Sequence, residues 1–256
     1  MATVAEITAR YENFLLPVPT PRSGVCVICK RSVLSGWPCC YQCKEHRIAL
    51  SHRADVVAPI ALAVKHDQWA HELSSYKNSS NPAARTSLAI GIGAVLWRWL
   101  ESHEMCVADY AGVDQFPLVT AVPSTRGRQP HPLGRMLKEI VKPTSARYAD
   151  LLHPNPDYPA GSRDVSDNRF HATKELSGEP VMLIDDQWTS GSRAQSAASA
   201  LKVAGASAVA VVVLGRHFDR RPDREDYREA ASAYYSAAKA QGWRWTACCI
   251  CNKQGT

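Results

Sequence analysis

Two adjacent carboxylates followed by a short turn rich in hydroxyl groups form the pattern that most clearly predicts chemistry in this chain. Asp185 and Asp186 come directly after the apolar run 181–184. After two intervening residues the turn begins, and it consists of Thr189, Ser190, Gly191, Ser192 and Arg193. A tight turn before a helix presents unpaired backbone N–H groups to an anion, and carboxylates accept hydrogen bonds from vicinal hydroxyls. The pattern therefore predicts a site for a ribose 5-phosphate.

The residues on either side predict a strand, a turn, a helix and a second strand that position this site. The run 181–184 is typical of a short buried strand. Small apolar residues recur at helical spacing from 194 to 204, and Gly205 is suited to end that helix. A second apolar run, 208–214, predicts the next strand. The acids should then stand where the first strand leaves the sheet.

The segment from Ile184 to Arg193 resembles the phosphoribosyl-pyrophosphate signature of type I phosphoribosyltransferases. The resemblance implies an α/β fold, with a parallel sheet flanked by helices, and a glycosyltransferase (phosphoribosyltransferase) activity. It also implies that Asp185 and Asp186 are catalytic residues that hold the ribose hydroxyls, and that the turn 189–193 binds the 5-phosphate. The chain departs from the signature at Arg193, where the family usually has threonine or serine. An ordinary acidic turn that caps a helix is the alternative.

A second polar turn follows the strand that is expected at 118–122. It offers hydroxyl and guanidinium groups from Ser124, Thr125, Arg126 and Arg128. Arginine side chains match the oxygen atoms of phosphate groups well. In the family that the signature resembles, the corresponding turn binds pyrophosphate, so the resemblance implies this role for the four residues, with Mg²⁺ accompanying the ligand. A basic surface loop is the alternative.

Two Cys-x-x-Cys pairs near the N-terminus predict a structural zinc site. Ten residues separate the pairs, whose members are Cys26, Cys29, Cys40 and Cys43. Each pair can turn both sulfurs toward one point, and four thiolates close a tetrahedral zinc shell, which favours a folding role over catalysis. Cys39 is an alternative to Cys40, and His46 is a reserve ligand. A disulfide pair is the competing interpretation, and a reducing compartment disfavours it.

The remaining cysteines leave two interpretations open. Cys248, Cys249 and Cys251 lie close together near the C-terminus. They either complete or neighbour the zinc site, or they pack as small buried hydrophobic side chains, which is the interpretation we favour. Cys106 is expected in the hydrophobic core.

The N-terminal part of the chain holds most of its excess positive charge. The formal net charge is +6, and between residues 21 and 53 a single acid, Glu45, faces six basic residues, which are Arg22, Lys30, Arg31, Lys44, Arg47 and Arg53. A basic zinc module can bind nucleic-acid phosphates, and a solvated surface on a structural knuckle explains the same charge. DNA is therefore an alternative partner.

The cysteine pairs, the stretch Ser75-Tyr-Lys77, the turn Val122–Arg126 and the two-acid signature occur in an order that resembles ComF-type, amidophosphoribosyltransferase-like proteins over about residues 24–218. The resemblance divides the chain into an N-terminal helix and zinc-ribbon module, 1–53, and a phosphoribosyltransferase-like α/β domain, 54–256. It also implies that the long polar segment 151–179 is a hood over the reaction centre.

Apolar runs elsewhere predict strands at 56–64 and 118–122 and helices at 4–16, 83–103 and 130–141.

Composition narrows the class of protein. The chain has 256 residues, of which 45% are hydrophobic and 21% charged, as is typical of globular proteins. Its beginning lacks a secretory pattern and its apolar runs are too short to span a bilayer, so a cytoplasmic protein without a membrane partner is expected.

The expected activity is transfer of the phosphoribosyl group from phosphoribosyl pyrophosphate to a nitrogen nucleophile, a base or an amine. The alternative is a non-catalytic ribose-phosphate sensor or DNA-binding module, and a homodimer is left open.

Overall fold

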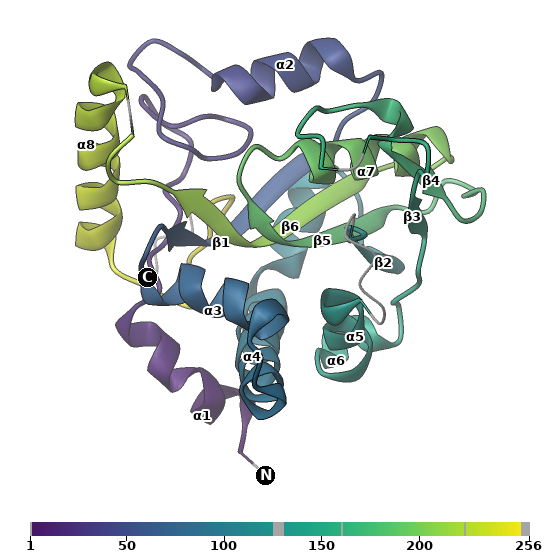
Figure 1. The fold of residues 1–256 in the computed structure, drawn as a ribbon, viewed down its shortest axis with the longest axis horizontal. Coiled ribbons are helices and arrows are strands. Elements are labelled where there is room, and N and C mark those ends of the chain that lie inside the picture. The colour runs from purple at the N-terminus through teal and green to yellow at the C-terminus, as the bar shows by residue number, and fades with distance from the viewer. Residues whose placement is uncertain (1, 125–130, 160, 223, 252–256) are drawn as a thin grey trace.

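A four-stranded parallel sheet lies at the centre of the protein (Figure 1). The computed structural model describes residues 2–124, 131–159, 161–222 and 224–251. Each neighbouring pair of strands is parallel, in the order β1 (Val56–Val64), β6 (Val209–Phe218), β5 (Val181–Trp188) and β2 (Leu118–Ala121). Parallel strands bring their carboxyl ends to one edge of the sheet, where ligands usually bind in such folds. The predicted α/β fold with a parallel sheet flanked by helices is confirmed.

Helices cover both faces of the sheet, because its strands are apolar on both sides. Along β5, Met182 and Ile184 pack into one layer, and Val181 and Leu183 pack into the other. The first layer contains α3 (Gln68–Asn78), α4 (Pro82–Ala111) and α5 (Pro132–Glu139). The second layer contains α7 (Ser192–Val203) and the cysteine-rich segment that precedes β1. Figure 1 shows the first layer below the sheet and α7 above it.

Shorter elements complete the fold. Before β1 the chain forms α1 (Val4–Thr8), the 3-10 helix η1 (Ala9–Asn13) and α2 (Tyr41–Ala49). After α5 come α6 (Lys142–Ser145) and the antiparallel pair β3 (Leu152–Pro154) and β4 (Phe170–Ala172), with η2 (Asp167–Arg169) before β4. The last helix is α8 (Glu225–Gln241). Within the described residues, none of the helices combines the length and the apolar character that crossing a membrane requires.

The two central strands are longer than the sequence predicts. β5 continues past Ile184 through both acids to Trp188, and β6 continues to Phe218. The extensions pair with each other, as in the pair of Gln187 with Gly215, so ladder hydrogen bonds keep these polar residues in the strand. The extension of β5 matters for the site, because it determines which way each acid faces.

Candidate functional site

The longer β5 sends the two acids toward opposite faces of the sheet, because side chains alternate along a strand. Asp186 faces α3, where the hydroxyl of Tyr76 donates to its Oδ2 at 2.9 Å and Lys77 Nζ forms an ion pair with the same oxygen. Asp185 Oδ1 accepts from the backbone N–H of Asp186 at 2.9 Å, and Asp185 has no ion-pair partner among the described residues. Both acids are buried. Asp186 is therefore held by an ion pair and a hydrogen bond from α3, whereas Asp185 is held by neither.

These surroundings give the two carboxyl groups different acidities. Burial raises the pKa of Asp185 to about 7, and the negative charge of Asp186 adds to this effect. Burial also acts on Asp186, but the ammonium group of Lys77 and the hydrogen bonds from Lys77 and Tyr76 outweigh it and hold the pKa of Asp186 below its ordinary value. Asp186 is thus the more acidic of the two carboxyl groups, and Asp185 is the one that takes up a proton first as the pH falls.

Gly191 shapes the turn that follows β5. Its φ of 85° lies in the left-handed region that favours glycine. A side-chain carbon at this position would come within 2.1 Å of the buried Trp188 ring, so the turn also needs glycine to close over that ring. The N–H of Ser192 donates to Ser190 Oγ at 3.3 Å, and the N–H groups of Ser190 and Gly191 have no acceptor in the part of the chain that the structure describes. These two N–H groups are available to an anion at the start of α7.

A cavity of about 280 Å³ joins the acids to the turn that follows β2. Asp185, Asp186 and Lys77 line it, together with Ser124 and Arg193. The acids therefore border an opening rather than a closed core, although Asp186 is ion-paired. Hydrogen-bond acceptors and cationic groups meet in a small volume here.

Part of the predicted pyrophosphate turn can be placed. Ser124 lines the cavity that contains the acids. Thr125, Arg126 and Arg128 lie outside the described residues, so their predicted role stays a prediction.

A second cavity, of about 740 Å³, borders the hydroxyl turn. Thr189, Ser190 and Ser192 line it. Five arginines line it, from the cysteine-rich segment, the segment 151–179, α7 and β6, and they are Arg31, Arg163, Arg169, Arg193 and Arg216. Arg193 lines both cavities. An opening with this many cationic groups favours an anionic ligand.

Arg216 connects the hydroxyl turn to the cysteine-rich segment. It is buried in β6, and its Nη1 donates to the carbonyl oxygens of Trp188 at 2.7 Å and of Thr189 at 3.3 Å. On the other side, its Nε donates to the Cys29 carbonyl at 3.0 Å, and its Nη2 lies 3.7 Å from Cys29 Sγ. One side chain therefore holds both the backbone of the turn and the backbone of the first cysteine pair.

The four predicted zinc ligands come together as one group. The Sγ atoms of Cys26, Cys29, Cys40 and Cys43 all lie within 4.8 Å of one another, and all four residues are buried. Cys40 precedes α2 as its N-cap and Cys43 lies in the first turn, so both sulfurs lie near the positive end of the helix dipole. The N–H of Cys40 also donates to Cys26 Sγ at 3.4 Å. Helix and loop together orient the sulfurs.

The donor set of this N-terminal cluster fits a divalent metal ion. Hydrogen bonds from the neighbouring thiols, that of Cys26 first, hold the pKa of Cys29 well below its usual range. Hydrogen bonds from the same neighbours, again Cys26 first, raise the pKa of Cys43. Four thiolates at this spacing would repel one another, so a cation is needed to hold all of them. Zn²⁺ takes four thiolates in a closed tetrahedron, so the cluster is compatible with the predicted zinc ribbon.

The two alternative ligands of this cluster lie outside it. Cys39 is half-buried and is not part of the group. His46 is buried on α2, where its Nδ1 has no partner among the described residues, and burial lowers its pKa to about 4. Cys40 and not Cys39 is therefore the third cysteine of the site.

The C-terminal cysteines do not join the N-terminal cluster. Cys249 is buried and donates to the Pro59 carbonyl at 3.3 Å, which agrees with packing as a small hydrophobic side chain. Cys248 and Cys251 instead lie beside His103 and Cys106 of α4. Cys106 is buried, as predicted, but it also lies beside His103, three residues away, and beside two cysteines that are distant in the sequence.

Sequence reasoning missed two partners of the site. Lys77 occupies the last turn of α3, and its sequence neighbours give no sign of an ion pair with a strand residue. The position of Arg216 could have been used to predict its importance. An arginine directly after a long apolar run must find hydrogen-bond acceptors if it is buried. The identity of those acceptors depends on the tertiary structure.

Comparisons of the chain with protein-family models, with known proteins and with solved structures found no match. The functional conclusion therefore depends on the geometry of the site.

Proposed function

We propose that this chain binds 5-phosphoribosyl 1-pyrophosphate with Mg²⁺ and transfers the phosphoribosyl group to a nitrogen nucleophile, a base or an amine, with release of pyrophosphate. The proposal includes a ComF-like version of the type I phosphoribosyltransferase fold. The observation that carries it is the pair of adjoining cavities that share Arg193. One contains the two acids, and the other contains the hydroxyl turn and the arginines. A ribose phosphate carries a diol and an anion within one small molecule, and this arrangement offers partners for both.

Each group has a role in this proposal. The 5-phosphate binds to the N–H groups of Ser190 and Gly191 and to the hydroxyls of the turn. Asp185, which lacks an ion-pair partner among the described residues, accepts hydrogen bonds from the ribose hydroxyls. Asp186 is a fixed anion that stabilises the positive charge that develops on the sugar. Lys77 and Ser124 line the same cavity as the acids and are proposed to bind the leaving pyrophosphate, with Thr125, Arg126 and Arg128 proposed to continue that binding surface.

The reaction exchanges a C–O bond for a C–N bond. The C1–O bond of the ribose breaks and its electron pair leaves with the pyrophosphate, while the nitrogen lone pair forms the new C1–N bond. A nitrogen nucleophile that carries a hydrogen then releases that proton to solvent. Mg²⁺ supplies charge neutralisation of the pyrophosphate when it is bound. The oxygen ligands that Mg²⁺ prefers are of the kind that Asp185 offers in this cavity.

The test is titration calorimetry with the magnesium complex of phosphoribosyl pyrophosphate, followed by an assay of pyrophosphate release across bases and amines. We expect Asp185→Asn to weaken binding by about tenfold or more, because a hydrogen bond to a charged group contributes about 1.5–3 kcal/mol. Asp185 is the residue of choice, because removing Asp186 would leave Lys77 unpaired. Asp109→Asn, at an exposed position of α4, is the matched control. Unchanged affinity in Asp185→Asn would contradict the proposal.

Two other outcomes correspond to the alternative function. Tight binding without pyrophosphate release to any acceptor supports a ribose-phosphate sensor. The exposed face of α2 carries Lys44 and Arg47 beside Tyr41, which is a surface suited to DNA phosphates and bases. DNA binding whose affinity falls steeply with salt supports that use. None of the nine cysteines forms a disulfide, which suits a reducing compartment, so the proposal places the protein in the cytoplasm.

A further inference from the structure

A second group of metal-binding side chains lies where the C-terminal segment meets α4. His103 and Cys106 belong to α4, and Cys248 and Cys251 belong to the segment after α8. Their ligand atoms all lie within 4.8 Å of one another. The two helix residues are buried and the two C-terminal cysteines are half-buried. Three thiolates and one imidazole form a common tetrahedral zinc site.

The histidine presents the nitrogen that a metal needs. His103 Nε2 lies 2.8 Å from the carbonyl oxygen of Trp245. A carbonyl accepts and does not donate, so Nε2 carries the proton and Nδ1 carries the lone pair. Nδ1 lies 3.6 Å from Cys251 Sγ and 3.9 Å from Cys106 Sγ, close to the spacing of about 3.6 Å between a nitrogen and a sulfur that share a tetrahedral zinc ion. Metal-bound histidines commonly donate their other N–H to a carbonyl in this way.

The C-terminal segment has little regular structure to hold it in place. Residues 242–251 form neither helix nor strand. Within the described residues, one backbone hydrogen bond joins two members of 243–251, from Ala247 to Arg244. Ordering an irregular segment costs conformational entropy, about 1–2 kcal/mol per residue for the backbone, which other contacts must offset.

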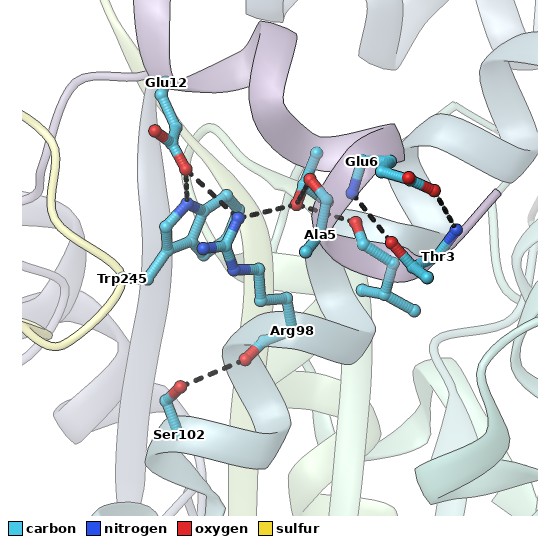
Figure 2. A network of polar contacts seen from close by, with 9 residues as sticks. Thr3, Ala5, Glu6, Glu12, Arg98, Ser102 and Trp245 are labelled. Atoms are coloured by element: carbon cyan, nitrogen blue, oxygen red, sulfur yellow. Dashed lines mark hydrogen bonds and ion pairs between the residues drawn. The ribbon is translucent and has the colours of Figure 1, made fainter.

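Polar contacts near Trp245 tie this segment to the N-terminal helices (Figure 2). Trp245 Nε1 donates to Glu12 at 2.6 Å, and the Arg98 guanidinium lies 4.3 Å from the centre of the Trp245 ring. Arg98 also donates to Glu12 at 3.1 Å and to Thr8 at 2.8 Å. Figure 2 shows Arg98 of α4 between the N-terminal helix and Trp245. The carbonyl of the same tryptophan orients His103, so these contacts and the ligand group position the same stretch of chain.

We infer that His103, Cys106, Cys248 and Cys251 bind a zinc ion that fastens the C-terminal segment to α4. The three thiols bind as thiolates and release their protons to solvent, while the histidine binds in its neutral form. The site also limits the movement of α8, because along the chain this helix connects β6 to the fastened segment. Tyr227 and Tyr234 of α8 line the cavity of about 740 Å³, so the zinc ion holds one wall of that cavity in place.

Zinc content per chain, measured by mass spectrometry of the metal, tests this inference on the full chain purified with a reductant. We expect two zinc ions in the wild type and one in Cys251→Ser. Cys249→Ser is the matched control, because Cys249 lies between two of the ligands in sequence but donates to Pro59. It should keep both ions. His103→Cys should also keep both, and its cobalt-substituted form should show stronger thiolate-to-cobalt absorption because a fourth thiolate replaces the imidazole.

A second measurement on the wild type avoids variants that do not fold. Iodoacetamide should modify Cys106, Cys248 and Cys251 at least tenfold faster after treatment with a chelator than before it, since zinc protects its thiolates. One zinc ion per wild-type chain, with these three thiols equally reactive before and after chelation, would overturn the inference. A disulfide between Cys248 and Cys251, whose sulfurs lie 3.0 Å apart, would also overturn it if it persisted in reduced protein.

Discussion

The two cysteine clusters differ in where their ligands come from along the chain. All four ligands of the N-terminal cluster lie between Cys26 and Cys43, and all are buried. The ligands of the C-terminal cluster come from α4 and from the segment after α8. His103 and Cys251 are 148 positions apart, and two of the four ligands are half-buried. The first cluster can assemble within its own segment. The second can assemble only after α4 and the C-terminal segment have met.

This difference determines what each cluster supports. Residues 14–40 form no helix and no strand longer than an isolated bridge, so contacts within the N-terminal cluster organise this stretch, and Arg216 links that cluster to the hydroxyl turn. The C-terminal cluster joins α4 to the segment after α8, and Trp245 links it to the N-terminal helices. A metal ion bound to the first cluster would thus create local structure, whereas one bound to the second would join parts that are distant in the sequence.

The largest effect should follow from breaking the N-terminal cluster. We expect Cys43→Ser to lower the melting temperature by about 10 °C or more, because a structural zinc site contributes several kcal/mol to folding. Cys251→Ser should cost less than half as much, because the rest of its surroundings remains packed. Thermal unfolding followed by circular dichroism measures both. Cys39→Ser, which lies outside the cluster, is the control. An equal or larger loss in Cys251→Ser would reverse the comparison.

Breaking the link from the N-terminal cluster to the turn should have an intermediate effect. Arg216→Met leaves the carbonyls of Cys29, Trp188 and Thr189 without their donor. We expect a loss of about 2–4 kcal/mol in the free energy of unfolding, measured with urea, and weaker binding of ribose 5-phosphate in calorimetry. The content of zinc should not change. Arg221→Met, at an exposed position, is the control. Full ligand affinity in Arg216→Met would show that the turn keeps its shape without this link.

Breaking the link from the C-terminal cluster to the N-terminal helices should have the smallest effect. Arg98→Met removes a partly exposed ion pair with Glu12 and a cation–π contact with Trp245. We expect a loss of about 1 kcal/mol in urea unfolding, with the zinc content unchanged. Arg135→Met, which removes the exposed pair with Glu139, should cost less. A loss of zinc in Arg98→Met would show that the network around Trp245 builds the metal site as well as flanking it.

Local features could be predicted because their causes act over a few residues. The strand 56–64 agrees with β1 at both ends, since its apolar run is bounded by polar residues. The spacing of Cys26, Cys29, Cys40 and Cys43 was sufficient to predict their cluster, because a Cys-x-x-Cys pair converges by local turn geometry. Gly191 was likewise predicted in a tight turn before a helix.

The sequence alone thus determined the kinds of element, the N-terminal cluster and the neighbourhood of the two acids with the hydroxyl turn. The tertiary structure decided that β5 continues through the acids and that Lys77 forms an ion pair with Asp186 and not with Asp185. It also decided that Arg216 joins the turn to Cys29. It also assembled the C-terminal cluster from residues 103 and 106 and residues 248 and 251. The physical reason is that periodicity and spacing act along the chain, whereas these contacts arise only when packing of the sheet and helices brings distant segments together.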